Sequence, residues 1–250
     1  MIDRDFPEGI YLVDFEFHPA KGKDGNPPVP VCMVVRSWPN GETSKYWQDE
    51  LFKMRSSPFP IGEKALFVAF YASAELDCFQ TLGWKYPANV LDLFVEFRCI
   101  TNGLKLTHGN SLLGVLLYFG LPNIGGEQKD EMRDLVLARG PWSKFEKGAI
   151  LEYCESDVVV LSGLLNVMEK HIDLPRSLLR GSYMKAVSRI QTNGIPIDEE
   201  IYEALLNQWD QIQDLLIAEI DQDYGVYEGR TFKVSSWEAY LISNEIPWPR

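Results

Sequence analysis

The hydrophobic period of the sequence changes near residue 94, and this change most limits the folds that the chain can adopt. Before residue 94, short apolar runs alternate with Gly, Pro and Asn turns, which is typical of strands. After it, apolar residues recur at three- and four-residue steps, which is typical of amphipathic helices. Strands therefore come first and helices follow, so the sequence predicts a fold that contains both kinds of element.

The individual elements can be predicted from the same pattern. We expect strands over 10–17, 30–38, 43–48, 65–71 and 88–93, and helices over 72–84, 110–119, 127–138, 144–169, 177–192 and 198–222. The first three strands are separated by a loop at 21–28 and a turn at 39–41, which predicts an antiparallel meander. Ser143, with Glu146 three residues later, predicts a capping box at the start of helix 144–169.

Composition and charge exclude several classes of protein. The chain has 250 residues, and 46% hydrophobic with 24% charged residues is an ordinary globular composition. The net charge of −12 excludes a basic nucleic-acid coat protein, but not an enzyme that handles one strand end through metal ions. The sequence has no signal peptide and no apolar stretch of about 18 residues, so we expect a cytoplasmic protein with no membrane partner.

Two acids stand close together on the first predicted strand, at Asp14 and Glu16. Side chains at i and i+2 of a strand point to the same face. Apolar residues flank both acids and the strand is expected to be central, so the two carboxylates would repel each other unless a cation lies between them. Hard oxygen ligands of this kind suit Mg²⁺ or Mn²⁺.

A tyrosine and a third acid are paired on the longest predicted helix of the first part of the chain. Tyr153 and Asp157 stand at i and i+4, so their side chains share one face of the helix. The positions around them at helical spacing are apolar, which predicts that this face borders the core. A phenol and a carboxylate one turn apart can together hold a water on a metal ion.

A fourth acid follows the buried strand 65–71, and there are two candidates for it, Glu75 and Asp77. An acid that borders the core face of a helix should have apolar neighbours at +3, +4 and +7. Glu75 has Cys78, Phe79 and Leu82 at these positions, whereas Asp77 is followed by Gln80 and Thr81 at +3 and +4. The pattern favours Glu75 and leaves Asp77 open.

The motifs LVDFEF, VAFYASAELDCF and LEYCESDVVVL, in this order, resemble those of the DEDD superfamily of 3′–5′ exonucleases, in the branch with tyrosine in the last motif. The resemblance covers about residues 8–170. It implies a ribonuclease H-like α/β fold: a mixed sheet of about five strands flanked by helices, with a small helical extension. Glu75 stands where most family members have Asp.

The resemblance also implies a mechanism and a set of site residues. Two divalent ions, Mg²⁺ or Mn²⁺, would clamp the scissile phosphate. Asp14, Glu16 and Asp157 would bind the first ion, Asp14 would bridge to the second, and Glu75 would hold the second. Tyr153 would orient the attacking water, and nucleoside 5′-monophosphates would leave from a 3′ end. Phe17, directly after the acidic pair, is the candidate for stacking on a substrate base.

The later part of the chain implies a larger protein. The segment LLRGSYMKAVSRIQTNGIPID at 178–198 is similar to the junction between the proofreading and polymerase domains of family A DNA polymerases. This implies a phage- or prophage-type polymerase, with the exonuclease domain at 1–174 and the helical, truncated start of a polymerase-type domain at 175–250. We expect a monomer that acts on a single-stranded DNA 3′ end, is normally joined to a polymerase domain in the same chain, and does not itself synthesise DNA.

Two other functions fit the same residues. The first is an RNase D-like exonuclease that processes RNA. The second is a non-catalytic domain that binds strands or holds a polymerase, which the Glu75 substitution suggests. Comparing the digestion of DNA with that of RNA separates the two nucleases, and a titration with Mn²⁺ separates both from a degenerate site.

Overall fold

The computed structural model describes residues 2–19, 28–122 and 126–248. Most of the expected loop at 21–28 lies outside these residues. Five strands form one sheet in the order β3-β2-β1-β4-β5. Their bounds are Gly9–His18 for β1, Val29–Trp38 for β2, Thr43–Trp47 for β3, Ala65–Ala69 for β4 and Asn89–Asp92 for β5.

The sheet is mixed. β1 pairs with β2 and β2 with β3 in antiparallel fashion, which confirms the predicted meander. β4 pairs in parallel with both β1 and β5. β4 is buried at all five of its positions, as its apolar run predicts for a strand covered on both faces.

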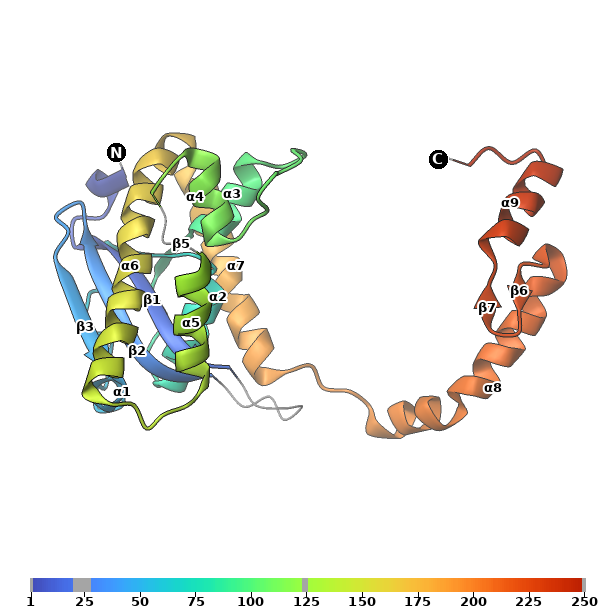
Figure 1. The fold of residues 1–250 in the computed structure, drawn as a ribbon, viewed down its shortest axis with the longest axis horizontal. Helices are drawn as coiled ribbons and strands as arrows, with labels where there is room; N and C mark the ends of the chain where they lie inside the picture. The colour runs from blue at the N-terminus through green and yellow to red at the C-terminus, as the bar shows by residue number, and fades with distance from the viewer. Residues whose placement is uncertain (1, 20–27, 123–125, 249–250) are drawn as a thin grey trace. The chain divides into compact units, whose positions relative to one another are not determined.

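Helices cover both faces of the sheet (Figure 1). Their bounds in the first part of the chain are Gln48–Leu51 for α1, Ala72–Thr81 for α2, Leu93–Ile100 for α3, Leu112–Phe119 for α4, Gly126–Leu137 for α5, Lys144–Met168 for α6 and Leu174–Asn193 for α7. The predicted capping box is present: Ser143 Oγ accepts from Glu146 N–H, and Glu146 Oε2 accepts from Ser143 N–H. The two short helices α1 and α3 were not predicted from the sequence.

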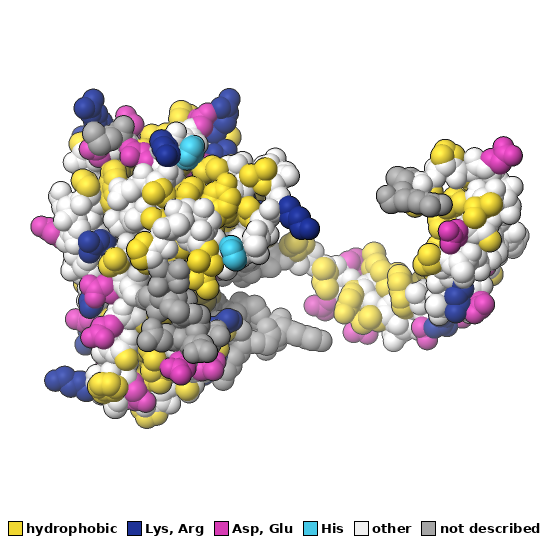
Figure 2. All heavy atoms as spheres, turned by 45° about the horizontal axis from the view of Figure 1, so that its top comes forward, with side chains coloured by type: hydrophobic (Ala, Val, Ile, Leu, Met, Phe, Trp, Pro, Cys, Tyr) yellow, Lys and Arg dark blue, Asp and Glu magenta, His cyan; other side chains and the backbone are white. Residues whose placement is uncertain are grey.

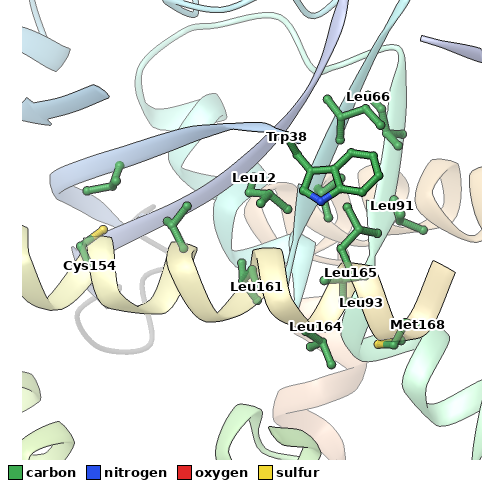
Figure 3. Close-up of a cluster of buried hydrophobic side chains, with 14 of the residues drawn as sticks. Leu12, Trp38, Leu66, Leu91, Leu93, Cys154, Leu161, Leu164, Leu165 and Met168 are labelled. Carbon is green, nitrogen blue, oxygen red and sulfur yellow. The ribbon is translucent and has the colours of Figure 1, made fainter. Parts of the chain in front are cut away.

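Alternate residues of β1 face two different cores. Leu12 lies in the core beneath α6, where Leu161, Leu164 and Leu165 pack on the sheet (Figure 3). Val13 and Phe15 point the other way, into the core that contains Phe79 of α2. This alternation places Asp14 and Glu16 on the α6 face of β1, the same face as Leu12.

Helix α7 belongs to the first compact unit, which runs over Met1–Gly194, whereas we expected the exonuclease domain to end at residue 174. The unit extends further because α7 packs directly on β5 and α2. Asp173 caps the first turn of α7, where Pro175 is tolerated because an N–H in that turn needs no partner within the helix. Arg180 holds α7 to α3 through two hydrogen bonds to Glu96, at 2.7 and 2.6 Å.

The second unit, Ile195–Arg250, consists of α8 at Glu199–Tyr224, a hairpin of β6 at Tyr227–Glu228 and β7 at Thr231–Phe232, and α9 at Val234–Ser243. Arg230 of the hairpin pairs with Asp210 and Asp214 of α8. No residue of α8 is buried. Hydrophobic side chains therefore lie exposed along it (Figure 2). Within the described ranges of the chain, no helix is both long and apolar enough to cross a bilayer.

Candidate functional site

Three acids from two distant segments meet between β1 and α6. Asp14 and Glu16 of β1 and Asp157 of α6 each offer one carboxylate oxygen, and these oxygens lie within 4.8 Å of one another. β1 supplies two of them because its even-numbered side chains face α6. Asp157 is buried, while Asp14 and Glu16 are half-buried. Such a group of hard oxygen donors can hold a Mg²⁺ or Mn²⁺ ion.

Glu75 approaches the same segment of β1 from α2. β4 pairs with β1 only up to Leu12, so the Phe15 N–H beyond this point can donate to Glu75. Burial, followed by the negative charges of Asp14 and Glu16, raises the pKa of Glu75 well above its usual range. The Glu75 side chain is 4% exposed, and its Oε2 atom is buried with no hydrogen-bond partner among the described residues.

A buried carboxylate oxygen without a hydrogen-bond partner, near two other acids, destabilises the folded protein when no cation is bound. A divalent cation would offset the repulsion between Glu75, Asp14 and Glu16, and the Glu75 oxygen could bind to it. The residues at this site therefore fit a metal ion both by their donor atoms and by this one orphaned atom.

Asp77 points away from this acidic group. Its Oδ1 atom accepts a hydrogen bond of 2.5 Å from Ser188 Oγ on α7. Burial raises its pKa, and the hydrogen bond from Ser188 opposes this shift. Of the two acids that the sequence left open, the structure thus brings Glu75, and not Asp77, to Asp14 and Glu16.

Tyr153 lies one helical turn before Asp157 and is half-buried. Its pKa is raised, first by burial and then by the charge of Asp157, with further contributions from Glu16 and Asp14. A hydrogen bond to the Asp157 carboxylate also favours the protonated phenol. Tyr153 therefore keeps its proton at neutral pH and remains a hydrogen-bond donor beside the acids.

The sequence reasoning missed Cys154, which is fully buried between α6 and β1. Its thiol lies 3.2 Å from Asp14 Oδ2 and 3.4 Å from the Asp14 carbonyl oxygen, and donates toward this residue. Its place within the LEYCESD motif, between Tyr153 and Asp157, was the only available signal. Cys154 helps to fix the orientation of the Asp14 carboxylate.

The sequence reasoning also missed Asp92, which holds the turn from β4 into α2. Its carboxylate accepts hydrogen bonds from the N–H groups of Tyr71 at 3.0 Å and Ala72 at 2.9 Å. Tyr71 has a left-handed backbone with φ of 72°, which is unfavourable for a residue with a side chain. Asp92 stabilises this turn and thereby positions the first turn of α2, which carries Glu75.

Phe17 is half-buried and packs against the core that contains Phe15 and Phe79. The register between β1 and β2 shifts between Glu16 and Phe17, so the pairing of the two strands is irregular at this point. Contact of Phe17 with a substrate base stays a prediction.

Comparison with known proteins identifies the fold of the chain but no sequence family. No protein-family model matches the chain, and no curated protein sequence matches it significantly. Among solved structures, RNase D of Trypanosoma brucei in complex with RNA U12 is 17% identical, with a TM-score of 0.51, over 78% of this chain and 68% of that one. The chain has a ribonuclease H-like fold.

Two further ribonuclease H-like structures resemble the chain more weakly. RNase D of Escherichia coli is 15% identical with a TM-score of 0.45, over 98% of this chain and 63% of that one. The EXO domain of Nibbler from Aedes aegypti is 13% identical with a TM-score of 0.42, over 77% of this chain and 89% of that one. The sheet order and the similarity to the T. brucei structure confirm the predicted ribonuclease H-like fold.

Proposed function

We propose that the first unit is a divalent-metal-dependent 3′–5′ exonuclease that releases nucleoside 5′-monophosphates from single-stranded DNA ends. The observation that carries this proposal is the convergence of Asp14, Glu16 and Asp157, whose carboxylate oxygens lie within 4.8 Å of one another. The ribonuclease H-like fold supports it, because the motif resemblance and the similar structures point to the same class of hydrolase.

Asp14, Glu16 and Asp157 would hold one Mg²⁺ or Mn²⁺ ion, and Glu75 would hold a second ion, with Asp14 between the two. When bound, the two ions supply Lewis-acid activation of water and neutralise the charge that develops on the phosphate. The Tyr153 phenol, which keeps its proton, orients the attacking water by hydrogen bonding. Phe17 offers a ring face to a base of the frayed strand.

The test of the acidic site is Asp14→Asn, which keeps the size of the side chain and an acceptor for the Cys154 thiol. We expect digestion of a 5′-labelled oligonucleotide in Mn²⁺ to fall at least about 100-fold, because a group that stabilises transition-state charge typically contributes this much. Asp49→Asn, at an exposed acid of α1, is the matched control and should digest normally. Undiminished digestion by Asp14→Asn would refute the site.

The direction of digestion is tested with the same oligonucleotide carrying a blocked 3′ end. A 3′–5′ exonuclease should shorten the unblocked strand stepwise and leave the blocked strand intact. Equal digestion of both strands would contradict the proposed polarity.

An RNA substrate is the second candidate, and the T. brucei structure favours it because that RNase D was solved in complex with RNA. The similarity of residues 178–198 to a polymerase junction favours DNA. Initial rates on a single-stranded DNA and an RNA of the same sequence decide between them. Faster digestion of RNA would replace the DNA proposal and leave the acidic site in place.

Metal binding distinguishes both nucleases from a degenerate domain. Calorimetric titration of the whole chain with Mn²⁺ should show binding at millimolar levels or below, and Asp14→Asn should weaken it. Absence of binding by the unmodified chain would favour the non-catalytic alternative.

The second unit is proposed to begin a polymerase-type domain. The resemblance at 178–198, which runs along α7 of the first unit and ends in the first residues of the second, supports this. The apolar side chains that α8 exposes, among them Trp209 and Leu216, support it as well. A following domain of the same chain would cover that face.

A further inference from the structure

A second candidate site lies within the first unit, at a cavity of about 970 Å³ between the loop that follows α2 and helix α7. The volume is at the upper end of roughly 300–1,000 Å³ for small-ligand pockets. None of the residues that line it belongs to the acidic group between β1 and α6.

The cavity is lined by three cations, Lys85, Lys185 and Arg189, and by no carboxylate of the described residues. None of these cations forms an ion pair within the part of the chain that the structure describes. Residues 1–194 hold 21 basic and 24 acidic residues, so three cations around one cavity without a carboxylate differ from the average of the first unit.

The cations are held in place by local contacts. Lys185 Nζ donates to the carbonyl oxygens of Ala88 at 2.8 Å and Pro87 at 3.3 Å. The guanidinium carbon of Arg189 lies 5.2 Å from the centre of the Tyr86 ring. Burial, followed by the positive charge of Arg189, lowers the pKa of Lys185, so the two cations are close enough to repel each other.

Tyr86, an aromatic residue in the wall of the cavity, is also held in place by hydrogen bonds. Tyr86 Oη lies 2.8 Å from Gln80 Oε1 and 2.9 Å from Ser188 Oγ, which joins the loop to both α2 and α7. The remaining lining includes Pro87, Ala186 and Ile190, which offer apolar surface beside the cations. Positive charge next to an aromatic ring and apolar surface suits a phosphate ester that carries a base.

We propose that this cavity binds a phosphodiester segment of the nucleic-acid strand, away from the end that is hydrolysed. A phosphate would neutralise the repulsion between Lys185 and Arg189, and Lys85 would contact a neighbouring phosphate. The identity of the ligand as the substrate strand rests on the proposed exonuclease function, whereas the anion site does not.

The test is the double variant Lys85→Gln/Arg189→Gln, which changes two exposed side chains and leaves the anchored Lys185 in place. Binding of a fluorescent single-stranded oligonucleotide is measured by anisotropy in EDTA, so that no hydrolysis occurs. The matched control is Lys64→Gln/Lys105→Gln, which removes the same charge from exposed positions outside the cavity.

We expect the cavity variant to bind at least about tenfold more weakly, and the slope of log affinity against log salt to become shallower by about 1.4, since each single-strand phosphate contact contributes about 0.7. The control should change affinity less than about twofold. Equal affinities of the two variants would overturn the site. If the cavity variant loses the binding of a nucleoside 5′-monophosphate but keeps its affinity for the oligonucleotide, the cavity binds a free nucleotide and the assignment to the strand is wrong.

Failure of this proposal is distinguishable from failure of the proposed function. Normal digestion of DNA with equal binding by both variants refutes the cavity and leaves the exonuclease. Selective loss of binding in a chain that digests no strand supports the cavity and refutes the exonuclease.

Discussion

At the residue scale, the geometry separates the roles of two acids that stand two positions apart on α2. Glu75 lies beside Asp14 and Glu16, whereas Asp77 accepts a hydrogen bond from Ser188 of α7. We expect Glu75→Gln to reduce nuclease activity far more than Asp77→Asn, because Glu75, and not Asp77, interacts with the charges of Asp14 and Glu16. The reverse order of activities would show that the second ion, if present, lies elsewhere.

Glu75→Gln should lower activity but raise the stability of the protein when no metal ion is bound. In EDTA, Glu75→Gln should raise the free energy of unfolding by on the order of 1 kcal/mol, because Gln cannot ionise, whereas burial and two neighbouring acids disfavour the ionised form of Glu75. In saturating Mn²⁺ the gain should disappear, since the unmodified chain binds the ion more tightly. Urea unfolding with and without Mn²⁺ measures both effects, and a variant that is less stable in EDTA contradicts the argument.

Cys154 acts through Asp14, and its effect is therefore one of positioning. Cys154→Ala removes the thiol that lies 3.2 Å from Asp14 Oδ2, so we expect a several-fold loss of kcat with little change in KM. Cys154→Ser restores a donor and should recover part of kcat. If Cys154→Ser and Cys154→Ala lose the same activity while both remain folded, packing and not the hydrogen bond is responsible.

At the element scale, helix α7 can lie directly on β5 because Gly181 has no side chain. A Cβ atom at this position would lie 1.9 Å from the carbonyl oxygen of Val90, closer than any real contact. Gly181→Ala should therefore destabilise the first unit by about 2–4 kcal/mol, since the obstacle is backbone and cannot move alone.

Gly163 in α6 provides the matched control, because a Cβ atom there would meet nothing within 4 Å. Gly163→Ala should stabilise the protein by about 0.5–1 kcal/mol through helix propensity. Thermal unfolding of the two variants measures the contrast. Equal effects would mean that α7 does not pack on β5 as closely as the structure shows.

At the scale of the whole molecule, most of the net negative charge lies in the second unit. Residues 195–250 carry 12 acidic and 3 basic residues, which gives a net charge of 3 − 12 = −9 out of −12 for the chain. The first unit is therefore much closer to neutral than the chain as a whole. This distribution suits a first unit that binds a phosphate strand.

The division into two units predicts that residues 1–194 fold and act alone. A chain ending at Gly194 should unfold in one transition at nearly the temperature seen for the first unit of the full chain, and should keep its nuclease activity. A chain ending at residue 174 is the comparison, and it should be strongly destabilised because it lacks α7 and the Arg180–Glu96 ion pair. Equal stability of the two truncations would place the boundary at 174 after all.

The sequence by itself determined most of the elements and their order. Hydrophobic period, turn residues and the Ser143–Glu146 capping box are local signals. Each depends only on residues that are close in sequence, so it can be recognised without knowing which elements pack together. The same holds for the Asp-x-Glu pair, because strand geometry alone puts Asp14 and Glu16 on one face.

Only the tertiary structure decided which side chains meet across long separations in sequence. It brought Asp157 to Asp14, turned Glu75 toward β1 and Asp77 toward α7, and extended the first unit to Gly194. It also showed Asp92 and Cys154, whose roles depend on the backbone of Tyr71 and the carboxylate of Asp14. Contacts of this kind depend on how helices pack on the sheet, and packing is set by the whole core at once and not by any single segment.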